Sequence, residues 1–471
     1  MEIRVTNLES PEDNHKALAW FTDYLSRQHE LIGRSGNVCP FVKPALQAKT
    51  LVMDVANYQE QHGLEDLCGL MRQQIDRFTN LNWAEDKASI GTLVTLITNM
   101  PEHLGVLLDE AQRRTKEYAV KKGLMIGQFH PNCPESAVHN PVFPVARSPE
   151  MLFAIRPMAI HDILFLHPHP RMFAEYQKRF AHRYDHSDSS VPKHYAHLYN
   201  LAQQRGSGRG EYIDYQSIDV LLSLQHPHTD HPSEMVFYLT GQVKELIFKL
   251  LYEQIRTVRL SLVTDNISNA IWELRRITAS LNVLSKMWDI LDTLAPTEFN
   301  AFREQLKGAS GIDSYMFRMV EFSLGHKSAK LAARYVDIPG VAEEVYRTLN
   351  DTSVYDEALA LLCRKGLLSP EALPHTTAAN ADVITAAWAD IYRTKGPADE
   401  LFLLAEALID VAEMFARWRA LHQLSVERMI GSKAGTGGTD GIAWLRRSAE
   451  HRFFPELWAA RTLLSAGPAP F

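Results

Sequence analysis

The second half of the chain is dominated by long segments with helical apolar spacing, and this feature constrains the fold most strongly. Apolar residues recur at positions i, i+3 and i+4, the spacing of an amphipathic helix. The predicted helices are Ile218–Gln225, Glu234–Arg259, Ile267–Thr293, Pro296–Lys307, Ser314–Leu324, Val341–Leu349, Ala381–Thr394 and Ala398–Met429. Strand-like runs are nearly absent there, so residues 205–471 are predicted to form an all-α domain.

The first half has a mixed pattern. Leu18–Arg27 and Glu65–Asn80 show helical spacing. By contrast, Gly123–Phe129, Met151–Ile155 and Ile163–Leu166 are short apolar runs bounded by Pro, Gly and His, which indicates strands. We interpret residues 1–200 as an α+β domain.

Two small polar stretches separate the halves, His186–Pro192 and Gln203–Gly210, and the second holds three Gly in eight residues. Both patterns are typical of linkers. A length of 471 residues also suits two or three domains. The predicted fold class is therefore an α+β domain followed by an all-α helical bundle.

The composition excludes several classes of protein. The net charge of −7 supplies no basic excess to neutralise phosphates, so we expect no nucleic-acid partner. Four widely spaced cysteines exclude a disulfide scaffold and a CxxC metal cluster. This use of cysteine fits a reducing compartment. The first residues lack an apolar signal core, and no run of about 18 apolar residues occurs. We expect a cytoplasmic protein without a membrane partner.

The segment Trp418–Gly441 is the most informative part of the sequence. A predicted helix carries His422 and is followed by a loop, Gly431–Gly441, with five Gly in eleven residues. A helix aims a histidine rigidly, and a glycine-rich loop lets backbone approach a ligand closely. Taken singly, the two features are more typical of a core histidine and a surface loop. The spacing of a phosphate-binding P-loop is absent.

Together, these features resemble the C-terminal signature of the tryptophan 2,3-dioxygenase family, W-R-x-x-H followed by R-x-I-G and GTGGSSG. Further segments resemble that family in the same order along residues 205–465: Glu211–Gln225, His231–Gln254, Pro296–Gly325 and Phe453–Arg461. The resemblance implies an all-helical, homotetrameric haem b enzyme. Members of the family add both atoms of O2 across the indole C2–C3 bond.

The resemblance also implies roles for individual residues. His422 falls on the proximal ligand of the haem iron, and Arg303 on the arginine that clamps the substrate carboxylate. Thr436 falls on the hydroxyl that contacts the substrate ammonium. Phe237 falls on an aromatic residue packed against the indole, and Phe299 on an aromatic position one helical turn before Arg303.

Two tyrosines complete the implied site. Tyr212 and Tyr215 fall on tyrosines that reach into a neighbouring subunit's site, so we expect a homo-oligomer, either a dimer or a tetramer. Some relatives attach haem through a Cys four residues after the histidine ligand. That position is Val426 here, which implies non-covalent haem b.

One departure from the family pattern stands at Gly241, where the family has its distal histidine. Replacing that histidine by glycine removes a hydrogen-bond partner and a potential base, and it leaves space over the implied haem. Three readings stay open. The chain is a dioxygenase of tryptophan or a close analogue, with an N-formylkynurenine-type product. Alternatively, it is a biosynthetic mono-oxygenase or peroxygenase of a modified aromatic amino acid. The third reading is a non-catalytic haem sensor.

The N-terminal domain resembles an uncharacterised bacterial domain through the segments Cys39–Leu46, Gly123–Cys133 and Arg147–Leu166. Its polar residues Arg147, Arg156, His161 and Asp162 line a second pocket or satisfy one another, and we favour the second interpretation. Several histidines have metal-like spacings, His182/His186, His194/His197 and His226/His228/His231. They fall near expected loops, so we favour solvated histidines there.

Overall fold

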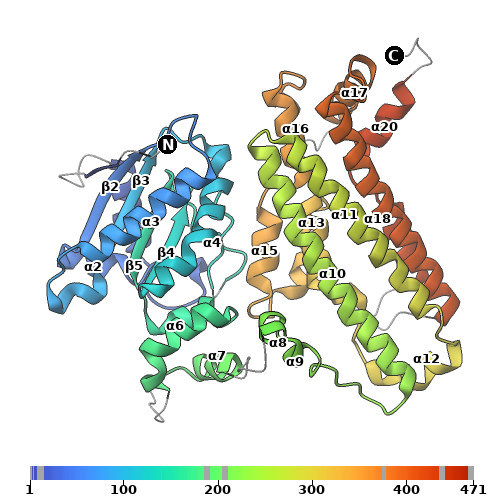
Figure 1. Ribbon diagram of the computed structural model, residues 1–471, viewed down its shortest axis with the longest axis horizontal. Helices are drawn as coiled ribbons and strands as arrows, with labels where there is room; N and C mark the ends of the chain where they lie inside the picture. The colour runs from blue at the N-terminus through green and yellow to red at the C-terminus, as the bar shows by residue number, and fades with distance from the viewer. Residues whose placement is uncertain are drawn as a thin grey trace. The chain divides into compact units, whose positions relative to one another are not determined.

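The structure is a computed structural model that describes residues 3, 5–7, 15–138, 140–184, 191–203, 211–373, 378–433 and 441–464. The chain divides into two compact units, Met1–Leu224 and Gln225–Phe471 (Figure 1). The division falls after Leu224, so the short helices α8 (Glu211–Gln216) and α9 (Ile218–Leu221) are grouped with the first unit.

The first unit is built on a mixed five-stranded sheet, which confirms the α+β interpretation. Its strands are β1 (Val5–Asn7), β2 (Leu51–Asn57), β3 (Thr92–Thr98), β4 (Leu124–Phe129) and β5 (Leu152–Pro157). Their order is β1-β2-β3-β5-β4. Only β2 and β3 pair in parallel; the other neighbours are antiparallel.

Helices cover this sheet because its strands are apolar on both faces. On β3, Val94 and Leu96 point into a core shared with the segment Trp20–Leu25 and α2 (Val42–Ala48). Helices α3 (Leu64–Asn80) and α4 (Gly105–Lys121) run side by side against the sheet (Figure 1). The unit also contains α1 (His15–Ala19), α6 (Pro170–Phe180) and α7 (Lys193–Gln203).

The strand predicted at Ile163–Leu166 is wrong, because these residues form the helix α5. The carboxylate of Asp162 accepts the Ala159 amide at 2.7 Å and so stabilises a helical turn just before them. Ile163 and Leu166, three positions apart, are both buried against Phe173 and Tyr176 of α6. A run of four apolar residues does not distinguish a strand from a helix by itself.

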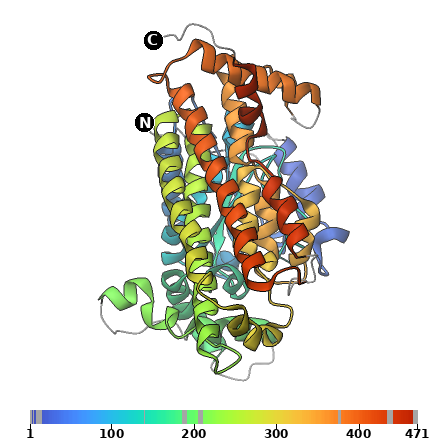
Figure 2. The same cartoon turned by 90° about the vertical axis from the view of Figure 1, so that its right-hand side faces the viewer.

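The second unit is helical throughout its described residues, as the sequence predicts. Its helices are α10 (Pro232–Val263), α11 (Ile267–Leu291), α12 (Pro296–Arg303), α13 (Tyr315–Leu324), α14 (Ala329–Ala332), α15 (Ala342–Asn350), α16 (Val354–Arg364), α17 (Ala378–Thr394), α18 (Glu400–Ile430), α19 (Ile442–Glu450) and α20 (Pro455–Leu463). The long helix α11 packs against α10 and against α18, and all three contribute to one hydrophobic core (Figure 2).

A buried ion network joins α13 to α18. Glu321 lies between two guanidinium groups, that of Arg318 and that of Arg419, whose Nη2 is 2.6 Å from the Glu321 Oε1. Arg419 also donates to the carbonyl of His451 at 3.2 Å. All three charged side chains are almost fully buried. They therefore fix the position of α18, the helix that carries His422.

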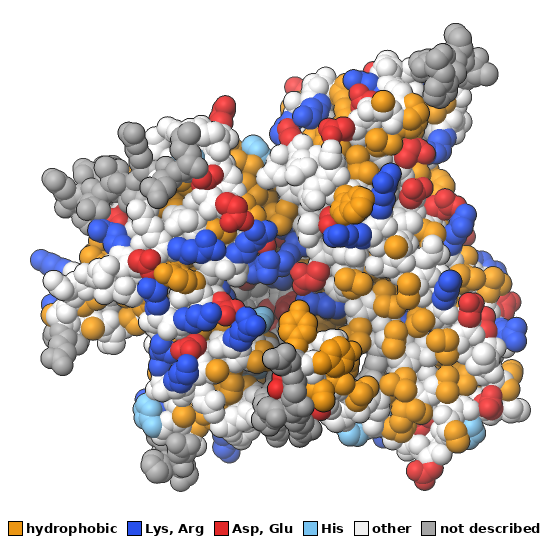
Figure 3. Space-filling model, viewed as in Figure 1, with side chains coloured by type: hydrophobic (Ala, Val, Ile, Leu, Met, Phe, Trp, Pro, Cys, Tyr) orange, Lys and Arg blue, Asp and Glu red, His pale blue; other side chains and the backbone are white. Residues whose placement is uncertain are grey.

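Hydrophobic side chains are also exposed on the surface of the second unit (Figure 3). On α10, Leu239, Val243, Leu246 and Leu250 are between 39% and 51% exposed. Their spacing of three to four residues places them along one face of the helix. No helix in the described parts of the chain is long and apolar enough to cross a membrane.

Candidate functional site

His422 lies in the last third of α18, between two tryptophan side chains. Its imidazole stacks on the indole of Trp288, with ring centroids 4.4 Å apart and planes 15° apart. The ring of Trp418, one turn earlier, is 5.7 Å away. Enclosure by these neighbours, with a smaller effect from the Lys244 charge, lowers the pKa of His422 to about 3. The imidazole is therefore neutral at neutral pH, the form that binds a metal ion.

Trp288, on α11, is a site residue that the sequence did not single out. A tryptophan on an apolar helix face is usually part of the core, so it carried no signal of its own. Its side chain is 5% exposed, and its indole Nε1 is buried with no hydrogen-bond partner among the described residues. A buried N–H without a partner is costly. This donor is thus available beside His422.

The side chain of Lys244 packs against the ring of Trp288. Its Nζ is 3.4 Å from the centroid of the Trp288 ring, a cation–π contact. Burial lowers the pKa of Lys244 to about 7, against an opposing effect of Glu245. The amine therefore titrates near neutral pH, next to the proposed metal ligand. No motif or spacing in the sequence points to this residue either.

Three phenylalanines form an aromatic cluster where α10 meets α12. The predicted pair Phe237 and Phe299 is brought together, with ring centroids 5.5 Å apart. Phe302, which the sequence analysis did not select, lies 5.8 Å from Phe237 and 5.3 Å from Phe299. Phe299 and Phe302 are buried in the hydrophobic core, and the partly buried Phe237 packs against it.

Polar contacts hold α12 against the neighbouring elements. Ser233 donates to Glu298 at 3.0 Å, and the same carboxylate accepts the Ala295 amide at the start of α12. Lys433, just after α18, donates to Asn300 at 3.3 Å. Arg303 is the last residue of α12 and is partly buried. Thr436 lies outside the described residues, so its predicted place beside Arg303 stays a prediction.

Gly241 lies on α10, one turn after Phe237, and is exposed. A Cβ built at this position meets no atom within 4 Å. The described surroundings therefore leave space for a side chain, which the glycine does not fill. Tyr212 and Tyr215 lie on α8 in the first unit, with 69% and 86% of their side chains exposed.

The polar residues predicted to satisfy one another in the first unit do so in part. Arg156 makes two bonds to the carboxylate of Asp162, at 2.7 and 2.8 Å, and lies over the Phe41 ring at 4.0 Å. His161 packs against the same ring. Arg147 is exposed. This ion pair is a structural link between β5 and the turn that precedes α5.

Of the histidines with metal-like spacings, two have polypeptide partners instead. His228 contacts the carbonyl of Gln305 at 2.9 Å, and His231 accepts the Ser233 amide. Within the described residues, the side chains grouped like metal ligands are Asp109, His130 and Cys133 of the first unit. The spacing His-x-x-Cys in HPNC could have indicated two of these three side chains. It could not indicate Asp109, which is remote in sequence.

The second unit is thus a helical unit in which a neutral histidine lies beside two tryptophan rings. The profile of tryptophan 2,3-dioxygenases matches residues 199–376 and 342–464. The tryptophan 2,3-dioxygenase of Burkholderia cenocepacia is 37% identical over 257 residues, 54% of this chain and 83% of that protein. That of a Bradyrhizobium species (strain BTAi1) is 36% identical over 265 residues, 55% of this chain and 95% of that protein.

The chain belongs to the tryptophan 2,3-dioxygenase family, which indicates an oxidoreductase. Residues 14–190 match a domain of unknown function. Both resemblances inferred from the sequence are therefore confirmed. The match to the tryptophan 2,3-dioxygenase family covers the second unit and the end of the first, from residue 199. The match over the rest of the first unit carries no activity.

Proposed function

We propose that the helical unit binds haem b through His422 and inserts O2-derived oxygen into the indole ring of L-tryptophan or a close analogue. The expected product is of the N-formylkynurenine type. The observation that carries the proposal is the neutral, enclosed imidazole of His422 against Trp288, in a chain of this family. A neutral imidazole on a rigid helix would suit a ligand of the haem iron.

The residues around His422 fit a haem group. The stacked ring of Trp288 holds the plane of the imidazole, and its buried Nε1, which has no hydrogen-bond partner among the described residues, could donate to a bound group. Gly241 is exposed on α10, and a larger side chain there would meet no described atom near its Cβ. When bound, haem supplies the activation of O2.

The chain's own residues bind and orient the substrate. Arg303 holds the carboxylate of the amino acid through its planar guanidinium group. Thr436 accepts a hydrogen bond from the ammonium group. Two fixed points on the amino-acid head orient the ring for reaction. Phe237 and Phe299 pack against the indole and exclude water from it.

Gly241 favours a second candidate function, mono-oxygenation or peroxygenation of a modified tryptophan or another aromatic amino acid. Without a side chain there, no imidazole donates to or accepts from the substrate at that position. A larger substrate would place different atoms near the O2-derived oxygen, so a different reaction could follow.

Mass spectrometry of products distinguishes these functions. Haem-loaded protein is reduced, mixed with L-tryptophan and air, and compared with Gly241→His and with His422→Ala. We expect a product heavier by two oxygen atoms with the native protein and none with His422→Ala. A gain of one oxygen would support the second function. Haem binding without any product from tryptophan or from substituted tryptophans would favour the sensor.

We also propose that the protein is a homo-oligomer. The support is the apolar stripe Leu239, Val243, Leu246 and Leu250 on α10, since side chains of this kind are usually covered in an assembly (Figure 3). Light scattering coupled to gel filtration is expected to give a dimer or tetramer mass. A monomer mass at micromolar concentration would contradict this proposal.

A further inference from the structure

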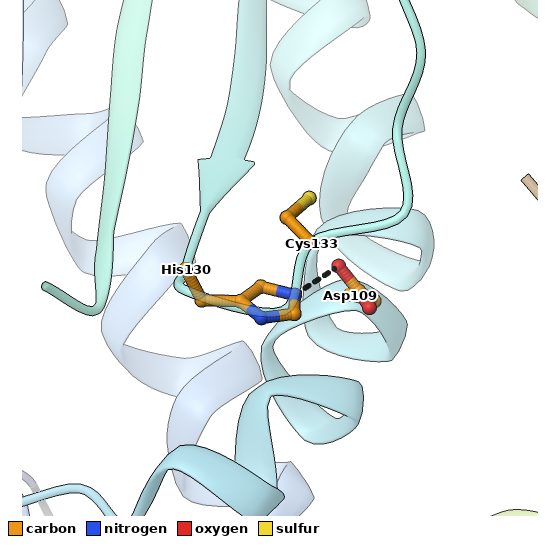
Figure 4. Close-up of side chains that lie close together, drawn as sticks. All are labelled: Asp109, His130 and Cys133. Carbon is orange, nitrogen blue, oxygen red and sulfur yellow. Dashed lines mark hydrogen bonds and ion pairs between the residues drawn. The ribbon is translucent and has the colours of Figure 1, made fainter. Parts of the chain in front are cut away.

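Three side chains of types that bind metal ions converge in the first unit. Asp109 lies one turn into α4, and His130 and Cys133 follow the end of β4 (Figure 4). One potential ligand atom from each lies within 4.8 Å of the other two. His130 and Cys133 are almost fully buried, whereas Asp109 is partly exposed.

Asp109 and His130 already face each other. The imidazole Nε2 of His130 is 3.1 Å from the Asp109 Oδ1. Gln128 donates to the same oxygen at 2.9 Å, which holds the carboxylate in place. A second residue that orients a ligand in this way is characteristic of metal centres. The thiol of Cys133 completes a nitrogen, oxygen and sulfur set.

The other ring nitrogen of His130 faces away from Asp109 and lies against Gly105. This nitrogen, Nδ1, is buried and has no hydrogen-bond partner within the described ranges. The ring is nonetheless held tightly, because a Cβ added at Gly105 would overlap it. The imidazole fits at this position because Gly105, the first residue of α4, has no side chain.

The same packing excludes a cysteine nucleophile activated by a His–Asp pair. In such a triad, one imidazole nitrogen binds the carboxylate and the other binds the thiol. Here Nε2 faces Asp109, whereas Nδ1 lies against Gly105. The ring therefore cannot bridge Asp109 and Cys133, and a shared ion is the arrangement that uses all three groups.

We propose that Asp109, His130 and Cys133 bind one divalent transition-metal ion of the Zn²⁺ type. Mixed nitrogen, oxygen and sulfur ligands suit a borderline ion such as Zn²⁺. Ligand atoms of a tetrahedral Zn²⁺ site lie about 3.3–3.8 Å apart, given bonds of about 2.0–2.3 Å, so small side-chain rotations close the site. Three protein ligands leave a fourth position for water or a substrate donor, the pattern of catalytic zinc.

The test uses the full chain loaded with Zn²⁺ and dialysed. Elemental analysis is expected to give one zinc per chain. X-ray absorption at the zinc edge, which haem iron does not disturb, is expected to show one sulfur at about 2.3 Å and lighter atoms at about 2.0 Å. Cys133→Ser should remove the sulfur shell. Cys39→Ser is the matched control in the same unit and should retain it.

Asp109→Asn covers the case in which Cys133→Ser fails to fold. This variant keeps the size and an oxygen acceptor for His130, and it should weaken Zn²⁺ binding about tenfold or more while circular dichroism stays unchanged. The proposal is overturned if the folded native chain retains no zinc after dialysis. It is equally overturned if the bound zinc shows no sulfur ligand, or if Asp109→Asn binds zinc as tightly as the native chain.

Discussion

The indole of Trp288 and the imidazole of His422 lie stacked, with centroids 4.4 Å apart, although they come from the different helices α11 and α18. Trp418 and Phe248 extend this aromatic contact into the hydrophobic core. The orientation of the proposed iron ligand is therefore set by the packing of the helical bundle. Changes to that packing should affect both stability and cofactor binding.

Replacing His422 by Ala should abolish tight haem binding, because the proposed axial ligand is lost. Visible absorption of the purified protein, reduced and oxidised, measures the effect. His194→Ala removes an exposed histidine from α7 and is the matched control. If His422→Ala retained haem with an unchanged spectrum, the ligand assignment would be wrong.

Trp288→Ala should lower the free energy of unfolding by about 3–5 kcal/mol, the range for large aromatic truncations in a core. The 5% exposure of Trp288 places it in that class. Trp288→Phe keeps a ring beside His422 and should cost less, yet it should shift the haem spectrum because the Nε1 donor is lost. Chemical denaturation measures the free energy. Trp272→Ala on the same helix, 55% exposed, should change it by no more than about 0.5 kcal/mol.

Glu321→Gln should destabilise the helical unit by about 3–5 kcal/mol, because the guanidinium groups of Arg318 and Arg419 would stay buried without their counter-ion. Thermal and urea unfolding measure the loss. Glu413→Gln breaks an exposed pair with Arg417 on α18 and should cost less than about 1 kcal/mol. Equal effects of the two substitutions would argue against the role of the buried network.

Lys244→Met should remove a pH dependence of stability. Burial lowers the pKa of Lys244 from 10.5 to about 7. Between these values the unfolded chain binds more protons at this residue, so stability from this group rises as the pH increases from 7 to 10.5. The variant should therefore exceed the native chain in stability most at pH 7 or below, and the difference should shrink towards pH 10.5. Thermal midpoints of both haem-free proteins, measured across this pH range, test whether the stability difference shrinks as the pH rises.

Arg303→Lys should lower kcat/KM for the amino-acid substrate by about 10–100-fold, because an ammonium group keeps the charge and loses the planar fork that orients a carboxylate. Steady-state kinetics measure the change. Arg275→Lys, at an exposed position on α11, is the control and should leave kcat/KM unchanged. A normal kcat/KM in Arg303→Lys would place the carboxylate elsewhere.

The sequence predicts the long helices of the second unit and the family to which the chain belongs, but it does not single out the shorter helices α14, α16, α19 and α20. Long helices repeat their apolar spacing over many residues, so α10, α11 and α18 were predicted close to their observed bounds. The motif around His422 also identified the family. Local periodicity reports which face of an element is buried, and that information lies within each segment.

Tertiary structure alone decided which distant side chains meet. The four residues Ile163–Leu166 became a helix because of the Asp162 turn and the packing against α6. Trp288 joined His422, and Asp109 joined His130 and Cys133, only through the packing of separate elements. No local pattern encodes such contacts, because they depend on how helices and strands from distant parts of the sequence pack against one another.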